Sequence, residues 1–124
     1  MSDDTDVARQ LIAAITAGDV AAVDALYHDD AVVFQNTSGQ TLSKRTMLGV
    51  IRFLATGVSE LHYEDVRVQP TPTGFVQQHV LCCRSAAGVE VRAHACLVAT
   101  VEEGRIRRLD EYLDAAAIAP LTGG

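Results

Sequence analysis

The chain has 124 residues, of which 48% are hydrophobic and 21% charged, and its formal net charge is −6. A chain of this length and composition is expected to fold as one globular domain, residues 1–124, with a core of its own. Its negative charge disfavours the phosphate backbone, so we expect no nucleic-acid partner. No apolar run approaches the roughly 20 residues of a membrane-spanning helix, so we expect no membrane partner either.

The cysteines and the N-terminal residues indicate a reduced compartment. The cysteines are Cys82, Cys83 and Cys96, and a strand would direct the first two to opposite faces. The acidic residues 1–6 lack the positive charge that begins a signal peptide. We therefore expect a cytoplasmic protein without disulfides. Neither C-x-x-C nor H-x-x-x-H occurs, so we predict no zinc site.

The first half of the sequence predicts three helices. Apolar side chains recur at helical spacing over residues 7–15, 20–26 and 47–54. Gly18 and Gly57 are expected at the ends of the first and third helices, since glycine favours helix termination. Asp19 and Ser43 are expected to cap the second and third helices through their side-chain oxygens.

The second half predicts an antiparallel meander. Strands are expected over residues 61–68, 75–84, 89–101 and 105–113, separated by turns that contain Gly or Pro. Earlier in the chain, a turn at 28–30 is expected to lead into a strand at 31–36 and a loop at 37–40. Helices followed by a meander indicate an α+β fold. We expect the three helices to pack on a curved antiparallel sheet that encloses a conical pocket.

The last predicted strand places two adjacent acids, Asp110 and Glu111, on opposite faces. If Leu109 faces the interior, Glu111 does too and becomes a carboxylate among apolar neighbours. Such burial raises the pKa of a carboxyl group and lets it move protons near neutral pH. Glu111 is therefore the candidate catalytic base or acid. The alternative is a satisfied ion pair with Arg107 or His79.

The second meander strand carries the other candidate side chains. His79 is predicted to be the titratable partner of Glu111, with its pKa raised by the carboxylate, although a hydrogen-bonded core histidine has the same pattern. Gln77, Leu81 and Cys83 share its face and are expected to bind substrate. Cys83 lies about 13 Å along the strand from His79, too far for a direct Cys/His nucleophilic pair.

The first strand supplies a candidate amide. Asn36 would orient the substrate as part of the catalytic set, or it would close the loop that follows through an Asx-type turn. Further side chains expected to bind substrate are apolar or aromatic: Tyr27, Phe34, Met47, Ile51 and Leu109.

The order of elements and two motifs resemble the NTF2-like superfamily. The segment from Tyr27 to Val32 enters the first strand, and a Gly-x-Ile-x-x-x-x-Glu-Tyr-x-Asp pattern runs from Gly104 to Asp114. The closing pattern is similar to the SnoaL-like and limonene-epoxide-hydrolase-like branches of this superfamily. The resemblance implies a cone-shaped fold around a small-molecule pocket. It does not specify a reaction, because this fold hosts isomerases, cyclases, dehydratases, hydrolases and non-catalytic binders.

The limonene epoxide hydrolase pattern is the nearest chemical template. Its aromatic-Gln-Asn strand and late carboxylate hold the nucleophilic water, and an Asp-Arg-Asp relay activates that water. The strand ending at Asn36 and Glu111 resemble the first part, although Phe34 lacks the tyrosine hydroxyl. In the relay, His79 replaces the arginine and Leu81 replaces the acid that protonates the epoxide. The resemblance therefore does not imply epoxide hydrolysis here.

These observations predict a cofactor-independent acid–base enzyme, of isomerase, cyclase or hydrolase type, for a small apolar oxygenated molecule. The first alternative is a non-catalytic module that binds such a molecule. A second is a structural dimerisation module whose cavity is filled by side chains. We expect a homodimer through the convex sheet face, where Val80, Cys82 and Val98 lie among polar residues.

Overall fold

The computed structural model describes residues 4–122; the expectation for the first three residues lies outside this range. The helices are α1 (Thr5–Thr16), α2 (Val20–Ala25) and α3 (Lys44–Thr56), with a short 3₁₀ helix at Ala119–Leu121. The strands are β1 (Tyr27–Gln35), β2 (Gln40–Ser43), β3 (Ser59–Thr71), β4 (Gly74–Arg84), β5 (Glu90–Glu102) and β6 (Arg105–Leu113).

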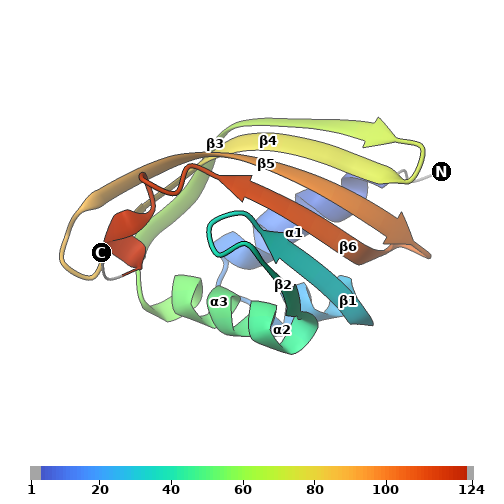
Figure 1. The fold of residues 1–124 in the computed structure, drawn as a ribbon, viewed down its shortest axis with the longest axis horizontal. Coiled ribbons are helices and arrows are strands. Elements are labelled where there is room, and N and C mark those ends of the chain that lie inside the picture. The colour runs from blue at the N-terminus through green and yellow to red at the C-terminus, as the bar shows by residue number, and fades with distance from the viewer. Residues whose placement is uncertain (1–3, 123–124) are drawn as a thin grey trace.

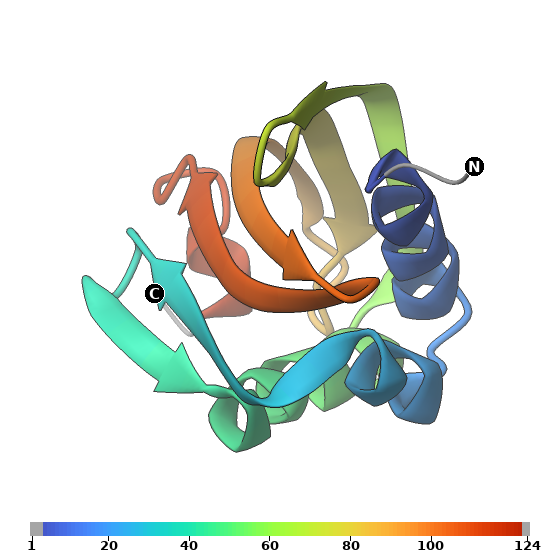
Figure 2. The same cartoon turned by 90° about the vertical axis from the view of Figure 1, so that its right-hand side faces the viewer.

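The strands form one curved sheet in the order β2-β1-β6-β5-β4-β3. Neighbouring strands are antiparallel except β1 and β6, which run parallel. The sheet arches over the helices (Figure 1), and the end-on view shows the helices closing the open side of the curl (Figure 2). The predicted α+β cone is confirmed, and its parallel pair joins the early strand to the last one.

The predicted helix ends are confirmed by their hydrogen bonds. Ser43 Oγ accepts the Thr46 backbone N–H at 3.2 Å, and Asp19 Oδ1 accepts the Ala22 N–H at 3.0 Å. Each bond satisfies a donor that the first turn of a helix leaves unpaired. After α1, Gly18 adopts a φ of +68°, a left-handed conformation that ends the helix at little steric cost.

Two local predictions around β1 are wrong. Residues 28–30, expected as a turn, belong to β1, whose first residue Tyr27 pairs with Ile106 of β6. The predicted loop ends in an unpredicted strand, β2, where Gln40 pairs with Gln35. Both segments are polar, so they lack the apolar alternation that marks a strand, and it is pairing with neighbours that makes them extended.

The core lies between the helices and the concave face of the sheet. The inward face of β5 is buried along its length, as predicted: Val91, Ala93, Ala95, Leu97 and Ala99. From the other layers, α1 contributes Leu11, α3 contributes Met47, and β4 contributes Phe75. Burying a side chain of that size contributes about 1.5–3 kcal/mol. Within residues 4–122, no helix is both long and apolar enough to cross a membrane.

Candidate active site

A cavity of about 490 Å³ lies between the concave face of the sheet and the helices. Strands β1, β3, β4, β5 and β6 form one side of its wall, and α1, α3 and the segment after β6 form the other. Most of the wall is apolar. Half-exposed Phe53 of α3 and Leu121 of the C-terminal segment lie on this wall too.

Glu111 projects into this cavity from the middle of the sheet. In the register, it lies opposite Gln35 of β1 on one side and Leu97 of β5 on the other. The side chain makes no hydrogen bond or ion pair with another residue of the described range, 4–122. Burial raises the pKa of Glu111 to about 7. The residue is therefore a carboxyl group that exchanges its proton near neutral pH.

A β-bulge removes Arg107 from the Glu111 face. Thr100 of β5 pairs with Arg108, and Val101 pairs with Ile106, so Arg107 is an extra residue between two paired positions. Its guanidinium binds Asp30 and, at 2.6 Å, Glu102. The expected alternative, an ion pair between Arg107 and Glu111, is therefore wrong, because the bulge interrupts the alternation of faces.

His79 lies on the same cavity wall and is only 6% exposed. Its Nδ1 is 2.8 Å from Gln77 Nε2, and its ring lies 4.6 Å from the Tyr63 ring, centroid to centroid. Burial lowers the pKa of His79 to about 4. The expected increase of this pKa by Glu111 is wrong, because desolvation dominates, and the imidazole is neutral at pH 7.

Glu111 and His79 face one cavity without bonding to each other; no hydrogen bond joins them within residues 4–122. Gln77, Leu97 and Glu111 form one row across three adjacent strands. Two strand spacings put the backbones of Gln77 and Glu111 about 10 Å apart, and His79 is the next inward residue along β4. Both side chains line the same cavity of about 490 Å³, so a small molecule bound there can contact the carboxyl group and the imidazole.

Two tyrosines add hydroxyl groups to the wall. Tyr27 enters from β1 and Tyr63 from β3. Burial raises the pKa of both phenols, and the charge of Glu111 raises them further. Both hydroxyl groups therefore keep their protons near neutral pH and remain able to donate hydrogen bonds.

Most residues expected to bind substrate do lie on the wall: Tyr27, Met47, Ile51, Leu81 and Leu109. Gln77 is behind the wall and reaches it only through His79. Cys83 shares the inward face of β4 but lies beyond the cavity, and burial raises the pKa of its thiol, which opposes a nucleophilic role. Whether the wall residues bind substrate stays a prediction.

Phe34 and Asn36 lie away from the cavity because Val33 and Gln35 are the inward residues of β1. The Phe34 ring packs on Tyr112, with centroids 5.9 Å apart. The Asn36 amide donates to the Leu113 carbonyl at 3.0 Å and accepts its N–H at 2.8 Å. Asn36 thus fastens the end of β1 to β6, instead of orienting substrate or closing its own loop.

Several wall residues were not predicted. Gln35 could have been found by assigning the other face of β1 to the interior. Tyr63 could have been found by assigning its face of β3 to the interior. Ile118 and Leu121 follow the last strand in a segment without strand or helix periodicity, so no sequence pattern places them at the cavity.

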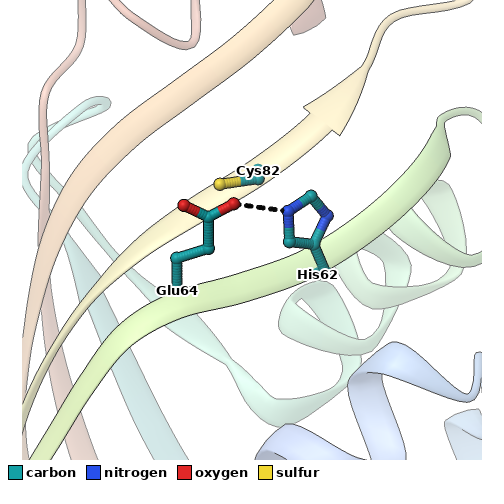
Figure 3. A group of neighbouring side chains, drawn as sticks. All are labelled: His62, Glu64 and Cys82. Carbon is teal, nitrogen blue, oxygen red and sulfur yellow. Dashed lines mark hydrogen bonds and ion pairs between the residues drawn. The ribbon is translucent and has the colours of Figure 1, made fainter.

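One cluster outside the cavity has metal-ligating side chains. His62, Glu64 and Cys82 each place one ligand atom within 4.8 Å of the others (Figure 3). Arg92, however, donates to Glu64 at 3.0 Å and to Cys82 Sγ at 3.4 Å. Hydrogen bonds from Arg92 and His62 hold the pKa of Glu64 at about 2. The ligand types suit a metal, but the Arg92 guanidinium already supplies a positive charge that compensates the Glu64 carboxylate.

Comparison with models of known protein families shows which family this chain belongs to. The model of the SnoaL-like domain matches residues 8–109, which is most of the sequence. The chain belongs to the SnoaL-like domain family. This confirms the resemblance to the NTF2-like superfamily that the motifs predicted. No curated protein matches the sequence.

Solved structures share the SnoaL-like fold at low sequence identity. An NTF2-like protein of unknown function from Burkholderia pseudomallei is 18% identical, with a TM-score of 0.84 and 100% of both chains covered. A proposed isomerase from Bacillus subtilis is 16% identical, with a TM-score of 0.83 and coverage of 98% of this chain and 93% of that chain. A proposed SnoaL-like polyketide cyclase from Shewanella putrefaciens is 15% identical, with a TM-score of 0.80 and coverage of 100% and 99%. These identities establish the fold alone.

Proposed function

We propose that this SnoaL-like protein is a cofactor-independent acid–base enzyme, of isomerase, cyclase or hydrolase type, for a small apolar oxygenated molecule. The observation that carries the proposal is Glu111, a carboxyl group without a protein partner in residues 4–122, on the wall of an otherwise mostly apolar cavity. The family resemblance is consistent with it, since similar folds include proteins proposed as isomerases and polyketide cyclases.

Burial gives Glu111 a pKa of about 7, so both of its protonation states are populated near neutral pH. The ionised form can take a proton from a carbon next to a carbonyl group, and the acid form can return it to the same or a neighbouring carbon. The C–H electron pair moves into the carbon framework and the charge moves to the carbonyl oxygen. Glu111 regains its starting state, so no oxidant or reductant is needed.

The wall also restricts the ligand. None of its described residues is Lys or Arg, and its titratable groups are Glu111, His79 and two tyrosines. An anionic ligand would enter without a cation to pair with, which is costly in an apolar cavity. A neutral molecule with one or two oxygen atoms suits this lining best.

The test is hydrogen exchange at carbon in D2O. We expect the protein to exchange the protons next to the carbonyl of bound 1-tetralone, cyclohexanone or a simple lactone, followed by NMR. Glu111→Gln should lower the rate at least about 100-fold, since a general base contributes about 10²–10⁴-fold. Asp110→Asn is the matched control, because Asp110 lies on the opposite face and pairs with Arg108.

Unchanged exchange in Glu111→Gln would contradict the proposal, and so would the absence of exchange in ketones that bind. The second outcome would favour a carrier of apolar molecules. One observation supports that alternative: Leu81 gives the wall an apolar side chain where an epoxide hydrolase would have its acid. A carrier returns its ligand unchanged, whereas an enzyme converts it.

A further inference from the structure

Gln77 and His79 form a buried polar pair on the inward face of β4. Gln77 is 1% exposed and His79 6% exposed, and the amide nitrogen of Gln77 lies 2.8 Å from His79 Nδ1. Gln77 does not reach the cavity itself, whereas His79 does. The glutamine therefore acts on a ligand only through the histidine.

The direction of this hydrogen bond follows from what each arrangement leaves unpaired. With one amide N–H donating to Nδ1, Gln77 Oε1 is the buried atom without a partner in residues 4–122, and one N–H of the same amide is also unused. The reverse arrangement would put Oε1 on a protonated Nδ1 and bury the NH₂ group with two unused donors. Unpaired buried carbonyl oxygens are tolerated more often than unpaired N–H groups. We therefore assign Gln77 as the donor and Nδ1 as the acceptor.

The other ring nitrogen then carries the proton. A neutral imidazole has one N–H, and Nδ1 is occupied as an acceptor, so the N–H is at Nε2. Within residues 4–122, Nε2 has no hydrogen-bond partner, and it is not one of the enclosed unpaired atoms. Tyr63 packs against the ring at 4.6 Å and limits its rotation. The free Nε2–H is thus available to a molecule in the cavity.

We propose that Gln77 is a positioning residue that holds His79 in its Nε2–H form, as a hydrogen-bond donor to a carbonyl oxygen of the cavity ligand. This inference rests on the proposed function and refines it: His79 is a neutral donor, and Glu111 alone moves protons. When Glu111 removes a proton next to the carbonyl group, the negative charge that develops on the oxygen faces His79 Nε2–H. A neutral imidazole suits this role because the donor need not give up its proton.

The first measurement is the tautomer of His79, read from two-bond ¹H–¹⁵N NMR spectra of the ¹⁵N-labelled protein between pH 6 and 8. We expect a protonated Nε2 and an unprotonated Nδ1 throughout. Protonation at Nδ1 would overturn the proposal, because Gln77 would then be the acceptor. In Gln77→Glu the ionised carboxylate can only accept, so a proton should appear on Nδ1 at pH values where the new side chain is ionised.

The second measurement separates positioning from simple structural support. The probes are 1-tetralone and tetralin, which share a ring system and differ in the carbonyl group. Gln77→Met should weaken 1-tetralone binding about 3- to 10-fold, as expected for one hydrogen bond, and leave tetralin binding unchanged. Gln78→Met is the control, because Gln78 is exposed on the opposite face of β4.

Equal weakening of both probes in Gln77→Met would overturn the proposal and assign Gln77 to packing. Neither measurement requires turnover. If carbon exchange fails but the tautomer and the ketone preference are found, the catalytic proposal falls and the donor role of His79 stands. If exchange occurs but Nδ1 carries the proton, the reverse holds.

Discussion

Glu111 is held in an environment that opposes its charge. No arginine, lysine or hydrogen-bond donor of residues 4–122 compensates the carboxylate, and Arg107, the partner considered from the sequence, binds Asp30 and Glu102 instead. Ionising such a group lowers the stability of the folded state, since the unfolded chain solvates the charge better. The Glu111 carboxylate therefore does not stabilise the fold, which favours a role in ligand binding or catalysis.

The pH dependence of stability should reveal this cost. Glu111 titrates near 7 when folded and at about 4.5 when unfolded, so the folded state binds more protons between these values. Stability should therefore fall as the pH rises from about 4.5 to 7, and Glu111→Gln should remove this loss. We expect the variant to be more stable above pH 7 by at most about 3 kcal/mol, and equal to the wild type below pH 4.5.

Urea unfolding at several pH values measures this difference. The comparison must be with the variant, because His79 contributes the opposite slope. Burial lowers the pKa of His79, so the folded protein loses stability as the pH falls below about 6.5. Asp110→Asn serves as the control and should change stability by less than about 0.5 kcal/mol at every pH. A pH-independent effect of Glu111→Gln would mean that the carboxyl group is not buried in solution.

The start of β4 lies too close to β5 for a side chain. A Cβ atom added to Gly74 would collide with the carbonyl oxygen of Ala99 in β5, and it would lie 2.8 Å from the Ala99 carbonyl carbon. Because both obstacles are backbone atoms, they cannot rotate away as a side chain would. Only glycine allows β4 to begin at this distance from β5, where it starts the strand that carries His79.

Two alanine substitutions should therefore have opposite effects. Gly74→Ala should lower the free energy of unfolding by about 1–3 kcal/mol, because the sheet must shift. Gly49→Ala, in the exposed face of α3 with no atom near the added Cβ, should raise it by about 0.5–1 kcal/mol through helix propensity. Thermal or urea unfolding gives both values, and a neutral Gly74→Ala would show that the strands are more widely spaced than described.

The elements differ in how far local sequence predicts them. Helix α3 is predicted well because Ser43 caps it, its apolar residues repeat, and Gly57 ends it. Strand β2 is missed because its four residues carry no apolar alternation and become a strand only by pairing with β1. Pairing between strands cannot be predicted from the pattern of a few neighbouring residues.

The two faces of the sheet have different surroundings in the whole molecule. The concave face encloses the cavity, while the convex face exposes apolar side chains, with Val98 41% and Tyr112 46% exposed. Val80 and Cys82, expected to share that exposed surface, are buried within the single chain. The apolar part of the convex face is therefore smaller than the sequence predicted and centres on β5 and β6.

We propose that two copies associate through this face. Light scattering coupled to gel filtration should give the mass of two chains, and Val98→Asp should shift the protein toward one chain by placing a charge in the apolar interface. Asp65→Asn, an exposed substitution on β3, is the control. A wild-type mass of one chain at working concentration would contradict the proposal.

The sequence by itself determined the architecture and the principal acid. Helical spacing, capping residues, four strands and a closing motif were sufficient for the cone, because these signals are local. Alternation next to Leu109 was sufficient to direct Glu111 inward. The tertiary structure alone decided what surrounds that acid. A bulge in β6 turned Arg107 away from Glu111. The orientation of β1 kept Phe34 and Asn36 out of the cavity. Burial left His79 neutral. Each depends on neighbours distant in the chain, and solvation and pairing are properties of the assembled fold.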